Sequence, residues 1–360
     1  MKQTYIIAEA GVNHNGSLDI AKSLIDVASD SGADAVKFQT FQADKLLVSS
    51  APKADYQKVR TSTSESQYAM IKKLELNVED HTALIDYCHH QKIQFLSTPF
   101  DLESLDLLTV TFNLPLLKIA SGEITNGPLL LNAAKSKRPI ILSTGMSTLG
   151  EIEMALSVLA YGYLDCQSKR PALHHFIDAY RSLEGQNLLR HYVTLLHCTT
   201  EYPAPFSEVN LKAMDTLRDA FQLPVGYSDH TLGIEIAIAA VARGATMIEK
   251  HFTLDKTLPG PDHQASLEPA ELTAMVKSIR HVDLSIGSGQ KIPGSTEFKN
   301  RLIARKSLVA LQNIKKGDIF TESNVGLKRP GNGIQGIYYW EWLKKIAPQD
   351  YNENELINDI

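Results

Sequence analysis

Two histidines, His230 and His251, each follow a short apolar run that predicts a buried strand. Between them, residues 234–245 are rich in Ala and Ile, which favours a helix that covers a parallel sheet. A strand–helix–strand unit brings the C-terminal ends of its two strands side by side, so both imidazoles can face one point. Imidazole suits divalent ions such as manganese, iron or zinc. The pair therefore predicts a two-histidine metal site, with hydrogen bonds to strand-end carbonyls as the alternative.

The elements that must position these histidines form a regular series. Short apolar runs that predict strands occur at residues 5–8, 35–38, 93–96, 116–120, 140–142, 192–196, 224–226 and 246–249. Helical patterns separate them; the first begins after Ser17, a good N-cap, and ends before Gly32. Eight strand–helix repeats predict a (β/α)8 barrel over about 280 residues. The alternative is an open doubly wound sheet, but no G-x-G-x-x-G follows the first strand.

Polar residues that directly follow the strands of such a barrel meet at one face, where active sites of this architecture lie. Amines and hydroxyls at this face belong to Lys37, Lys118, Ser121, Ser143 and Ser228. Together they can bind a phosphate and a carboxylate through charge-assisted hydrogen bonds, which predicts an anionic substrate. Glu9 and Glu123 also follow strands, and we expect them to transfer protons or to bind sugar hydroxyls.

Composition excludes several classes of protein. The chain has 360 residues, which favours one large domain and one small one. A net charge of −5 without a basic cluster argues against binding to nucleic acid or to a membrane surface. The first residues lack the pattern of a signal peptide, and no apolar run reaches membrane-spanning length. Cys88, Cys166 and Cys198 form no C-x-x-C pair, so we expect a reduced, cytoplasmic setting.

The pattern changes after residue 286. We predict a catalytic barrel at 1–286, a linker at 287–304 and a small β-rich domain at 305–360. The small domain contains the motif R-P-G-N-G, a glycine-bearing loop that presents Arg329. Residues 164–191 form an insertion in the barrel, for which we expect one or two surface helices and no chemistry.

Short motifs recur along the whole chain, most of them at the predicted strand ends. In order they are A-E-A-G-V-N-H-N-G-S from Ala8, V-K-F-Q-T-F from Val36, S-T-P-F-D from Ser97, K-I-A-S-G-E from Lys118, I-L-S-T-G-M from Ile141, L-H-C-T-T-E-Y-P-A-P-F from Leu196, S-D-H-T from Ser228, I-E-K-H-F-T-L-D from Ile248, G-P-D-H from Gly260 and K-R-P-G-N-G from Lys328. In this ordered set the chain resembles the bacterial sialic acid synthases and their legionaminic acid relatives. The resemblance implies a (β/α)8 barrel followed by an antifreeze-like (SAF) domain, in a domain-swapped homodimer.

The activity that this resemblance implies is the condensation of phosphoenolpyruvate with an open-chain N-acetylmannosamine-type sugar and water. The products are phosphate and a nine-carbon 2-keto sugar acid, N-acetylneuraminate. By resemblance, His230 and His251 bind Mn2+ or Mg2+, which polarises the sugar aldehyde. The lysines and serines named above match positions that bind phosphoenolpyruvate. Glu123 is the first choice for proton transfer and Glu9 the second.

The acceptor sugar is the point that the resemblance leaves open. Positions that match sugar-binding or neighbouring residues are Gln39, Tyr202, Asp262 and Arg329. Some sialic acid synthases carry Asn where this chain has Thr200, and a few pocket contacts decide which sugar is accepted. One alternative is therefore a legionaminic acid synthase that uses 2,4-diacetamido-2,4,6-trideoxymannose. Others are a synthase for a different acceptor, such as an arabinose phosphate, and a non-catalytic sugar-binding scaffold.

Overall fold

The computed structural model describes residues 3–48, 51–52, 66–165 and 170–358. The chain folds into two compact units, Met1–Ile286 and Gly287–Ile360, which we describe separately.

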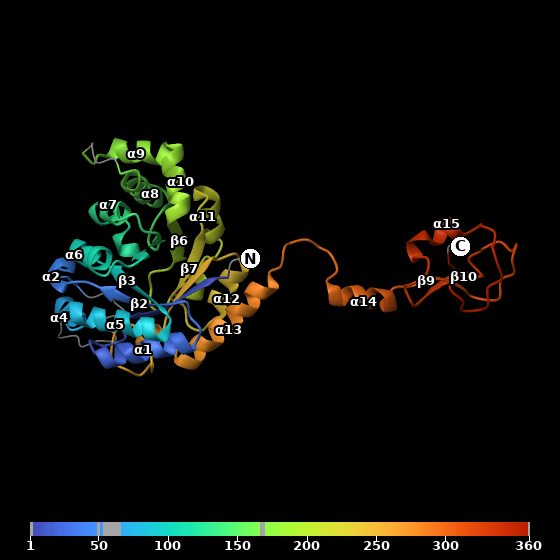
Figure 1. The fold of residues 1–360 in the computed structure, drawn as a ribbon, viewed down its shortest axis with the longest axis horizontal. Helices are drawn as coiled ribbons and strands as arrows, with labels where there is room; N and C mark the ends of the chain where they lie inside the picture. The colour runs from blue at the N-terminus through green and yellow to red at the C-terminus, as the bar shows by residue number, and fades with distance from the viewer. Residues whose placement is uncertain (1–2, 49–50, 53–65, 166–169, 359–360) are drawn as a thin grey trace. The chain divides into compact units, whose positions relative to one another are not determined.

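The first unit is built on eight parallel strands (Figure 1). They are β1 (Tyr5–Gly11), β2 (Ala35–Thr40), β3 (Gln94–Pro99), β4 (Leu117–Ile119), β5 (Ile140–Ser143), β6 (Val193–Cys198), β7 (Val225–Asp229) and β8 (Met247–His251). Hydrogen bonds link them in the order β3-β2-β1-β8-β7-β6-β5-β4, and β3 and β4, the two ends of this order, contact each other. This arrangement confirms the predicted (β/α)8 barrel and excludes the open doubly wound sheet.

The main helices that follow the strands cover the outside of the barrel (Figure 1). They are α1 (Leu18–Asp30), α5 (Val78–Gln91), α6 (Leu102–Asp106), α7 (Gly127–Lys135), α8 (Leu149–Tyr163), α11 (Ala213–Phe221), α12 (Glu235–Ala242) and α13 (Pro269–Ser285). Ser17 caps α1 as predicted, since its hydroxyl accepts a hydrogen bond from the backbone N–H of Ile20. Gly32, with φ of +78°, follows the end of the helix in a conformation that favours glycine. None of the helices in the described residues is both long and apolar enough to cross a membrane.

Two segments carry additional short helices. Residues 42–76, too long for a plain loop, contain α2 (Ala43–Leu46) and α4 (Gln67–Lys72) in their described parts. The insertion at 164–191 contains α9 (Leu173–Arg181) and α10 (Leu183–Tyr192), the surface helices that the sequence predicts.

The two faces of each barrel strand have different partners, because successive side chains of a strand point in opposite directions. Ile6 and Ala8 belong to the large core that includes the surrounding helices, whereas Ile7 belongs to a small core with Ala35 and Ile141. The small core fills the interior of the barrel. Two residues further along the same faces come Glu9, Lys37 and Ser143. All the strands except β4 run beyond their predicted ends, and these polar residues lie within strands, directly above the interior core.

The second unit is small and β-rich. It consists of α14 (Ser295–Ala304), an antiparallel pair of strands, β9 (Ser307–Ala310) and β10 (Val325–Lys328), a 3-10 turn, η5 (Gly336–Tyr338), and α15 (Tyr339–Trp342). Leu308, Phe320 and Tyr351 are central to its own hydrophobic core. Much of the segment expected as a linker is thus helical, in α14.

Candidate active site

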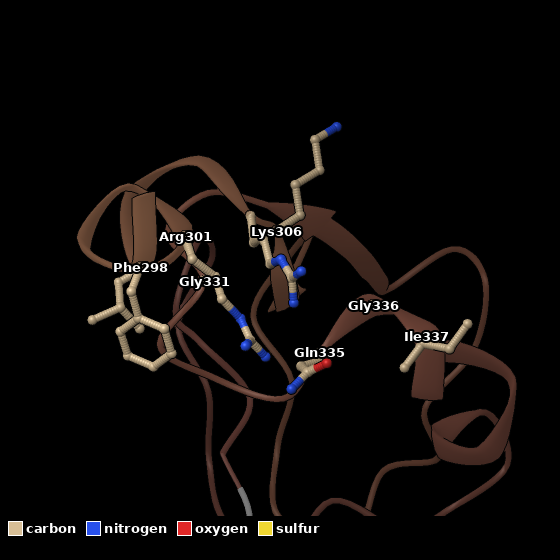
Figure 2. A pocket seen from close by; sticks show the side chains of 9 residues that line it. Phe298, Arg301, Lys306, Gly331, Gln335, Gly336 and Ile337 are labelled. Carbon is tan, nitrogen blue, oxygen red and sulfur yellow. The ribbon is translucent and has the colours of Figure 1, made fainter. Parts of the chain in front are cut away.

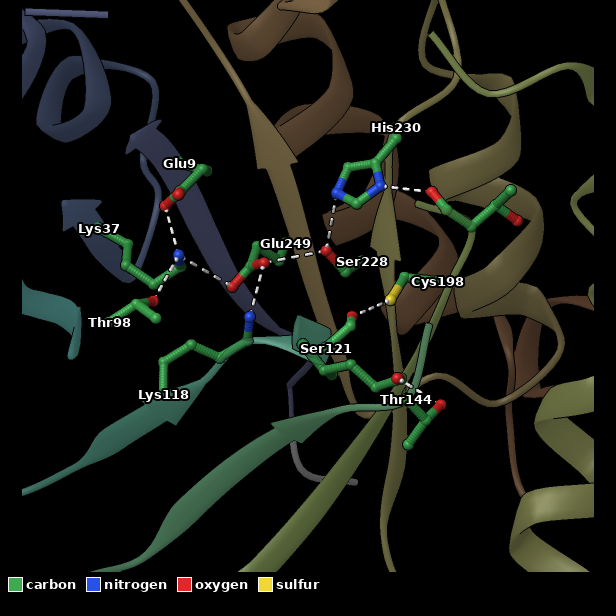
Figure 3. A network of polar contacts seen from close by, with 12 residues as sticks. Glu9, Lys37, Thr98, Lys118, Ser121, Thr144, Cys198, Ser228, His230 and Glu249 are labelled. Atoms are coloured by element: carbon green, nitrogen blue, oxygen red, sulfur yellow. Dashed lines mark hydrogen bonds and ion pairs between the residues drawn. The ribbon is translucent and has the colours of Figure 1, made fainter. Parts of the chain in front are cut away.

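Two lysines and two glutamates converge at the C-terminal ends of the barrel strands (Figure 3). Lys37 Nζ lies 2.7 Å from Glu9 Oε2 and 3.7 Å from Glu249 Oε2. Lys118 Nζ lies 3.1 Å from Glu249 Oε1. All four side chains are at most 5% exposed. We call these four residues the open cluster, since they face the mouth of the barrel, where active sites of this fold lie.

The register of the parallel strands explains why these residues meet. Glu9 on β1 is the partner of Lys37 on β2 and of His251 on β8. Ser228 on β7 is the partner of Glu249 on β8. Each of these positions faces the barrel interior, and they form two adjacent levels. Glu9, Lys37 and His251 are in register with one another, and Ser228 is in register with Glu249, which lies two residues before His251.

The two carboxyl groups of the open cluster have different proton affinities. Burial raises the pKa of Glu9 to about 7, against the opposing effect of Lys37. Burial disfavours the charge of Glu249 too, but Lys118 and Lys37 outweigh it and lower its pKa to about 2. The pKa of Lys37 rises despite burial, because Glu249 and Glu9 stabilise its charge. At neutral pH Glu249 is therefore an anion, whereas Glu9 exchanges a proton, a division of roles typical of catalytic carboxyl pairs.

Hydroxyl and thiol groups complete the ring around the open cluster. Ser228 Oγ donates a hydrogen bond to Glu249 Oε1 over 2.9 Å, and Lys37 Nζ donates one to Thr98 Oγ1 over 3.2 Å. Ser121 Oγ lies 3.2 Å from Cys198 Sγ. These contacts place Ser228 and Ser121, two of the predicted phosphoenolpyruvate-binding serines, in the same network as the lysines or beside it (Figure 3).

Ser143, the third of these serines, is buried at the end of β5. The turn that follows it packs tightly against the ring. A Cβ added to Gly145 would lie 2.9 Å from both Ser121 Oγ and Cys198 Sγ, and 2.4 Å from Thr200 Oγ1. Glycine is therefore needed for this close approach of the backbone.

His230 and His251 lie side by side, with ring centroids 5.6 Å apart. His230 Nδ1 donates to the carbonyl oxygen of Thr199 over 2.6 Å, which directs its Nε2 toward the site. Burial lowers the pKa of His230 to about 4 and holds the pKa of His251 well below its usual value, so both rings are neutral at pH 7. Nδ1 of His251 is buried without a hydrogen-bond partner among the described residues.

This pair fits a divalent ion, because neutral imidazoles are suitable ligands and one of them has an unsatisfied buried nitrogen. The described part of the chain holds no group of three or more His, Cys, Asp or Glu side chains arranged around a common point. A metal bound here would be held by the two imidazoles, and water or substrate could take further coordination positions.

The predicted sugar-binding residues have different locations. The Tyr202 ring lies 4.3 Å from that of His230, and 5.6 Å from that of His251, between centroids. A Cβ on Gly11 would lie within 3.5 Å of Gln39 Nε2, Glu9 Oε1 and His251 Cε1, so Gln39 borders the same site. Asp262 is buried in the loop after β8. Arg329 is exposed in the second unit.

Glu123 follows β4 in a short 3-10 turn and is half-buried. Its Oε2 accepts a hydrogen bond from Asn126 Nδ2 over 2.7 Å, and Asn126 caps α7. Of the two glutamates predicted to transfer protons, Glu9 contacts a lysine, Lys37. Glu9 therefore belongs to the open cluster, whereas the hydrogen bond described for Glu123 is to Asn126.

Sequence reasoning misses Glu249, which contacts Lys37, Lys118 and Ser228. A signal for it exists in the sequence. Glu249 precedes His251 by two residues in one strand, so both must face the same side. Any strand that directs His251 into the site also directs Glu249 there.

The whole chain is similar to several known proteins. A model described as the NeuB family matches residues 24–291. An N,N'-diacetyllegionaminic acid synthase of Campylobacter jejuni is 54% identical over 100% of both chains. A protein of the same name from Legionella pneumophila is 48% identical over 92% of this chain and 86% of its own. Among solved structures, the N-acetylneuraminic acid synthetase of Leptospira borgpetersenii, in complex with citrate, is 33% identical, with a TM-score of 0.67 over 83% of this chain and 90% of that one.

Proposed function

The chain belongs to the NeuB family, and from this premise we propose that it is an N,N'-diacetyllegionaminic acid synthase. The observation that carries the proposal is the 54% identity to a synthase of that name over the full length of both chains. It corrects the order of acceptors given by the sequence, in which N-acetylmannosamine came first and 2,4-diacetamido-2,4,6-trideoxymannose second. The many related synthases also speak against a non-catalytic scaffold.

The proposed reaction joins three carbons of phosphoenolpyruvate to six carbons of the open-chain sugar. A bond forms between C3 of phosphoenolpyruvate and the aldehyde carbon, and the aldehyde oxygen takes up a proton. Water adds to C2 and loses one proton, which balances the proton taken up by the aldehyde oxygen. The bond from C2 to the phosphate oxygen then breaks, the remaining hydroxyl proton passes to the phosphate, and C2 becomes the keto carbon. The protein must therefore bind a trianion, supply one proton, and stabilise the charge of the departing phosphate.

Lys37 and Lys118 are the groups that bind the anion. Both are buried and point to the barrel mouth, where the hydroxyls of Ser121 and Ser228 supplement them (Figure 3). Ser143, buried at the end of β5, would add a third hydroxyl. An ammonium group in such a site forms strong charge-assisted hydrogen bonds with phosphate and carboxylate. Glu249 lies between the two lysines and fixes the positions of both ammonium groups.

Glu9 is the proton donor in this proposal. Its pKa of about 7 leaves a protonated fraction at neutral pH, which suits a general acid for the oxygen of the sugar aldehyde. Glu123, at the rim, remains the second candidate, for proton transfer as the phosphate leaves. Gln39, Tyr202 and Asp262 would contact the sugar.

His230 and His251 would hold the divalent ion, Mn2+ or Mg2+. When bound, such an ion acts as a Lewis acid toward the sugar aldehyde. The Thr199 carbonyl fixes the tautomer of His230 and so keeps Nε2 available as a ligand.

We also propose a domain-swapped homodimer, in which Arg329 of each chain contacts the N-acyl group of the sugar in the partner's barrel. Two features of the second unit support it. Residues 287–360 carry more Lys and Arg than Asp and Glu although the whole chain is acidic, and Ile337 and Trp340 are exposed.

Mixing Lys118→Met chains with Arg329→Ala chains tests the exchange of domains between the two subunits. A swapped dimer regains about a quarter of wild-type activity, because half of the mixed dimers' sites are intact; no recovery after subunit exchange would refute it.

The decisive experiment measures phosphate release from phosphoenolpyruvate with Mn2+ present, in parallel reactions with the two sugars. We expect a higher kcat/KM with 2,4-diacetamido-2,4,6-trideoxymannose than with N-acetylmannosamine. The opposite preference would make the protein a sialic acid synthase. If neither sugar led to phosphate release, a different acceptor sugar or a non-catalytic sugar-binding scaffold would be favoured. The expected compartment of this reaction is the cytoplasm.

A further inference from the structure

The loop that carries Arg329 is held from one side by α14. The Gly331 N–H donates a hydrogen bond to the carbonyl oxygen of Leu302 over 2.7 Å. A Cβ on Gly331 would lie 2.8 Å from Arg305 Cβ and 2.9 Å from the Arg301 carbonyl oxygen. The loop backbone therefore packs directly on the last turn of the helix. Figure 2 shows Arg301 of α14 and the loop residues around Gly331 and Gln335 as walls of one pocket.

Ser307, the first residue of β9, holds the same loop from the other side. Its side chain is fully buried. The Ser307 hydroxyl donates to the carbonyl oxygen of Pro330 over 2.8 Å and accepts from the Gly333 N–H over 3.0 Å. One hydroxyl thus links both ends of the turn that follows Arg329.

The backbone on either side of this turn is fixed as well. Lys328, the last residue of β10, is the strand partner of Ser307. Beyond the turn, the Leu308 N–H donates to the carbonyl oxygen of Ile334 over 2.9 Å. The turn is therefore the part of this segment that depends on the Ser307 side chain, and Arg329 stands at its start.

We propose that Ser307 is a positioning residue for Arg329, and that it sets the affinity for the acceptor sugar without touching it. The inference rests on the proposed function, in which Arg329 contacts the sugar. Without the hydroxyl, the Pro330 carbonyl and the Gly333 N–H lose a common partner, and the turn populates other conformations. A ligand that binds only one conformation then shows an affinity reduced by the fraction of molecules in that conformation.

The test uses the full-length holoenzyme with Mn2+ and compares Ser307→Ala, Arg329→Ala and the double variant. We expect Ser307→Ala to raise the KM for the sugar about tenfold and to leave the KM for phosphoenolpyruvate unchanged. The double variant should be no worse than Arg329→Ala, because a positioning residue has no effect once the residue it positions is gone. Ser307→Cys, which keeps the size but weakens the hydrogen bonds, should lie between wild type and Ser307→Ala.

Ser323→Ala is the matched control, since Ser323 lies in the same unit, is exposed and bonds to the Thr321 hydroxyl. Thermal unfolding identifies any variant that fails to fold, in which case Ser307→Cys carries the test. Additive effects of Ser307→Ala and Arg329→Ala, or an unchanged KM for the sugar in Ser307→Ala, overturn the inference about Ser307 and leave the proposed function standing. An active wild type whose sugar KM is insensitive to Arg329→Ala overturns the arginine contact and this inference together. Lack of phosphate release by wild type with either sugar overturns the proposed function and, with it, the inference.

Discussion

Strands β7 and β8 contribute to two buried lysine–carboxylate clusters whose surroundings differ completely. Glu249 faces the barrel mouth and belongs to the open cluster with Glu9, Lys37 and Lys118. The next residue, Lys250, faces the surrounding helices. Its Nζ lies 2.9 Å from Asp229 Oδ2, and both side chains are completely buried. We call Lys250, Asp229 and Thr231 the closed cluster.

The closed cluster satisfies its own groups. Asp229 Oδ1 accepts hydrogen bonds from the backbone N–H and the hydroxyl of Thr231, and Lys250 donates to the Thr231 carbonyl. Burial lowers the pKa of Lys250, although Asp229 opposes this effect, whereas the two carboxylates around Lys37 raise the pKa of that lysine. The same pair of residue types thus occurs in two settings: one carboxylate meets one lysine among helices, and two carboxylates share two lysines at the barrel mouth. We expect a structural role for the closed cluster and a chemical role for the open cluster.

Loss of a lysine from the open cluster should have the largest effect on activity. We expect Lys118→Met to lower kcat/KM for phosphoenolpyruvate about 100- to 1,000-fold, because a charge that stabilises the departing phosphate is lost. Steady-state phosphate release measures it. Lys135→Met, at an exposed position of α7, is the control and should retain activity. Near-normal turnover by Lys118→Met would contradict a chemical role for the open cluster.

Loss of the lysine of the closed cluster should act on stability instead. Lys250→Met leaves Asp229 as a buried, unpaired charge, and we expect the free energy of unfolding to fall by about 3–5 kcal/mol. Urea denaturation measures this change. The folded fraction should keep the wild-type kcat/KM. A variant that is as stable as wild type but inactive would reverse the assignment of the two clusters.

Metal binding by His230 and His251, beside the open cluster, can be tested without measuring turnover. We expect His251→Ala to weaken Mn2+ binding at least about 100-fold. Loss of a residue that only hydrogen-bonds to a metal ligand weakens binding by up to about 100-fold, and loss of a ligand itself should cost at least as much. Titration calorimetry measures the affinity directly. His174→Ala, at an exposed position of α9, should bind like wild type. Equal Mn2+ affinity in wild type and in His251→Ala would place the metal elsewhere.

The proton assigned to Glu9 should appear in the pH profile. Glu9 is protonated below its pKa of about 7 and ionised above it, so a reaction that needs the acid form slows as pH rises through 7. Glu9→Gln should lower kcat about 100-fold and remove this limb from the profile. Glu123→Gln should keep the limb. If instead Glu123→Gln removed it, the order of the two glutamates derived from the sequence would be restored.

The smallest effect is expected for a hydroxyl of the closed cluster. Thr231→Ala removes one donor to Asp229, and we expect a loss of about 1.5 kcal/mol in the free energy of unfolding with unchanged activity. Ser228→Ala is the counterpart in the open cluster. Ser228→Ala should lower the free energy of unfolding less than Thr231→Ala does, since Glu249 still contacts both Lys37 and Lys118. It should, however, raise the KM for phosphoenolpyruvate. Equal stability losses in the two variants would mean that the clusters do not differ in this respect.

Much of the fold and several site residues follow from local rules. The eight apolar runs, the Ser17 cap and the glycine after α1 predict the barrel element by element. Motifs at the strand ends identify both lysines, both histidines and Glu9. The predicted strands other than the one at 116–120 nevertheless end too early, because the apolar runs stop where polar residues begin, while backbone pairing continues through those residues.

The sequence by itself determined which residues can do chemistry here, since residue type and period-2 alternation depend only on neighbours in the chain. Only the tertiary structure decided how those residues act on one another. Whether Glu9 or Glu123 meets a lysine, and which side chains Glu249 meets, depends on the packing and register of strands far apart in the sequence. Burial disfavours the charge of both Glu9 and Glu249, and the two lysines that contact Glu249 lower its pKa below that of Glu9.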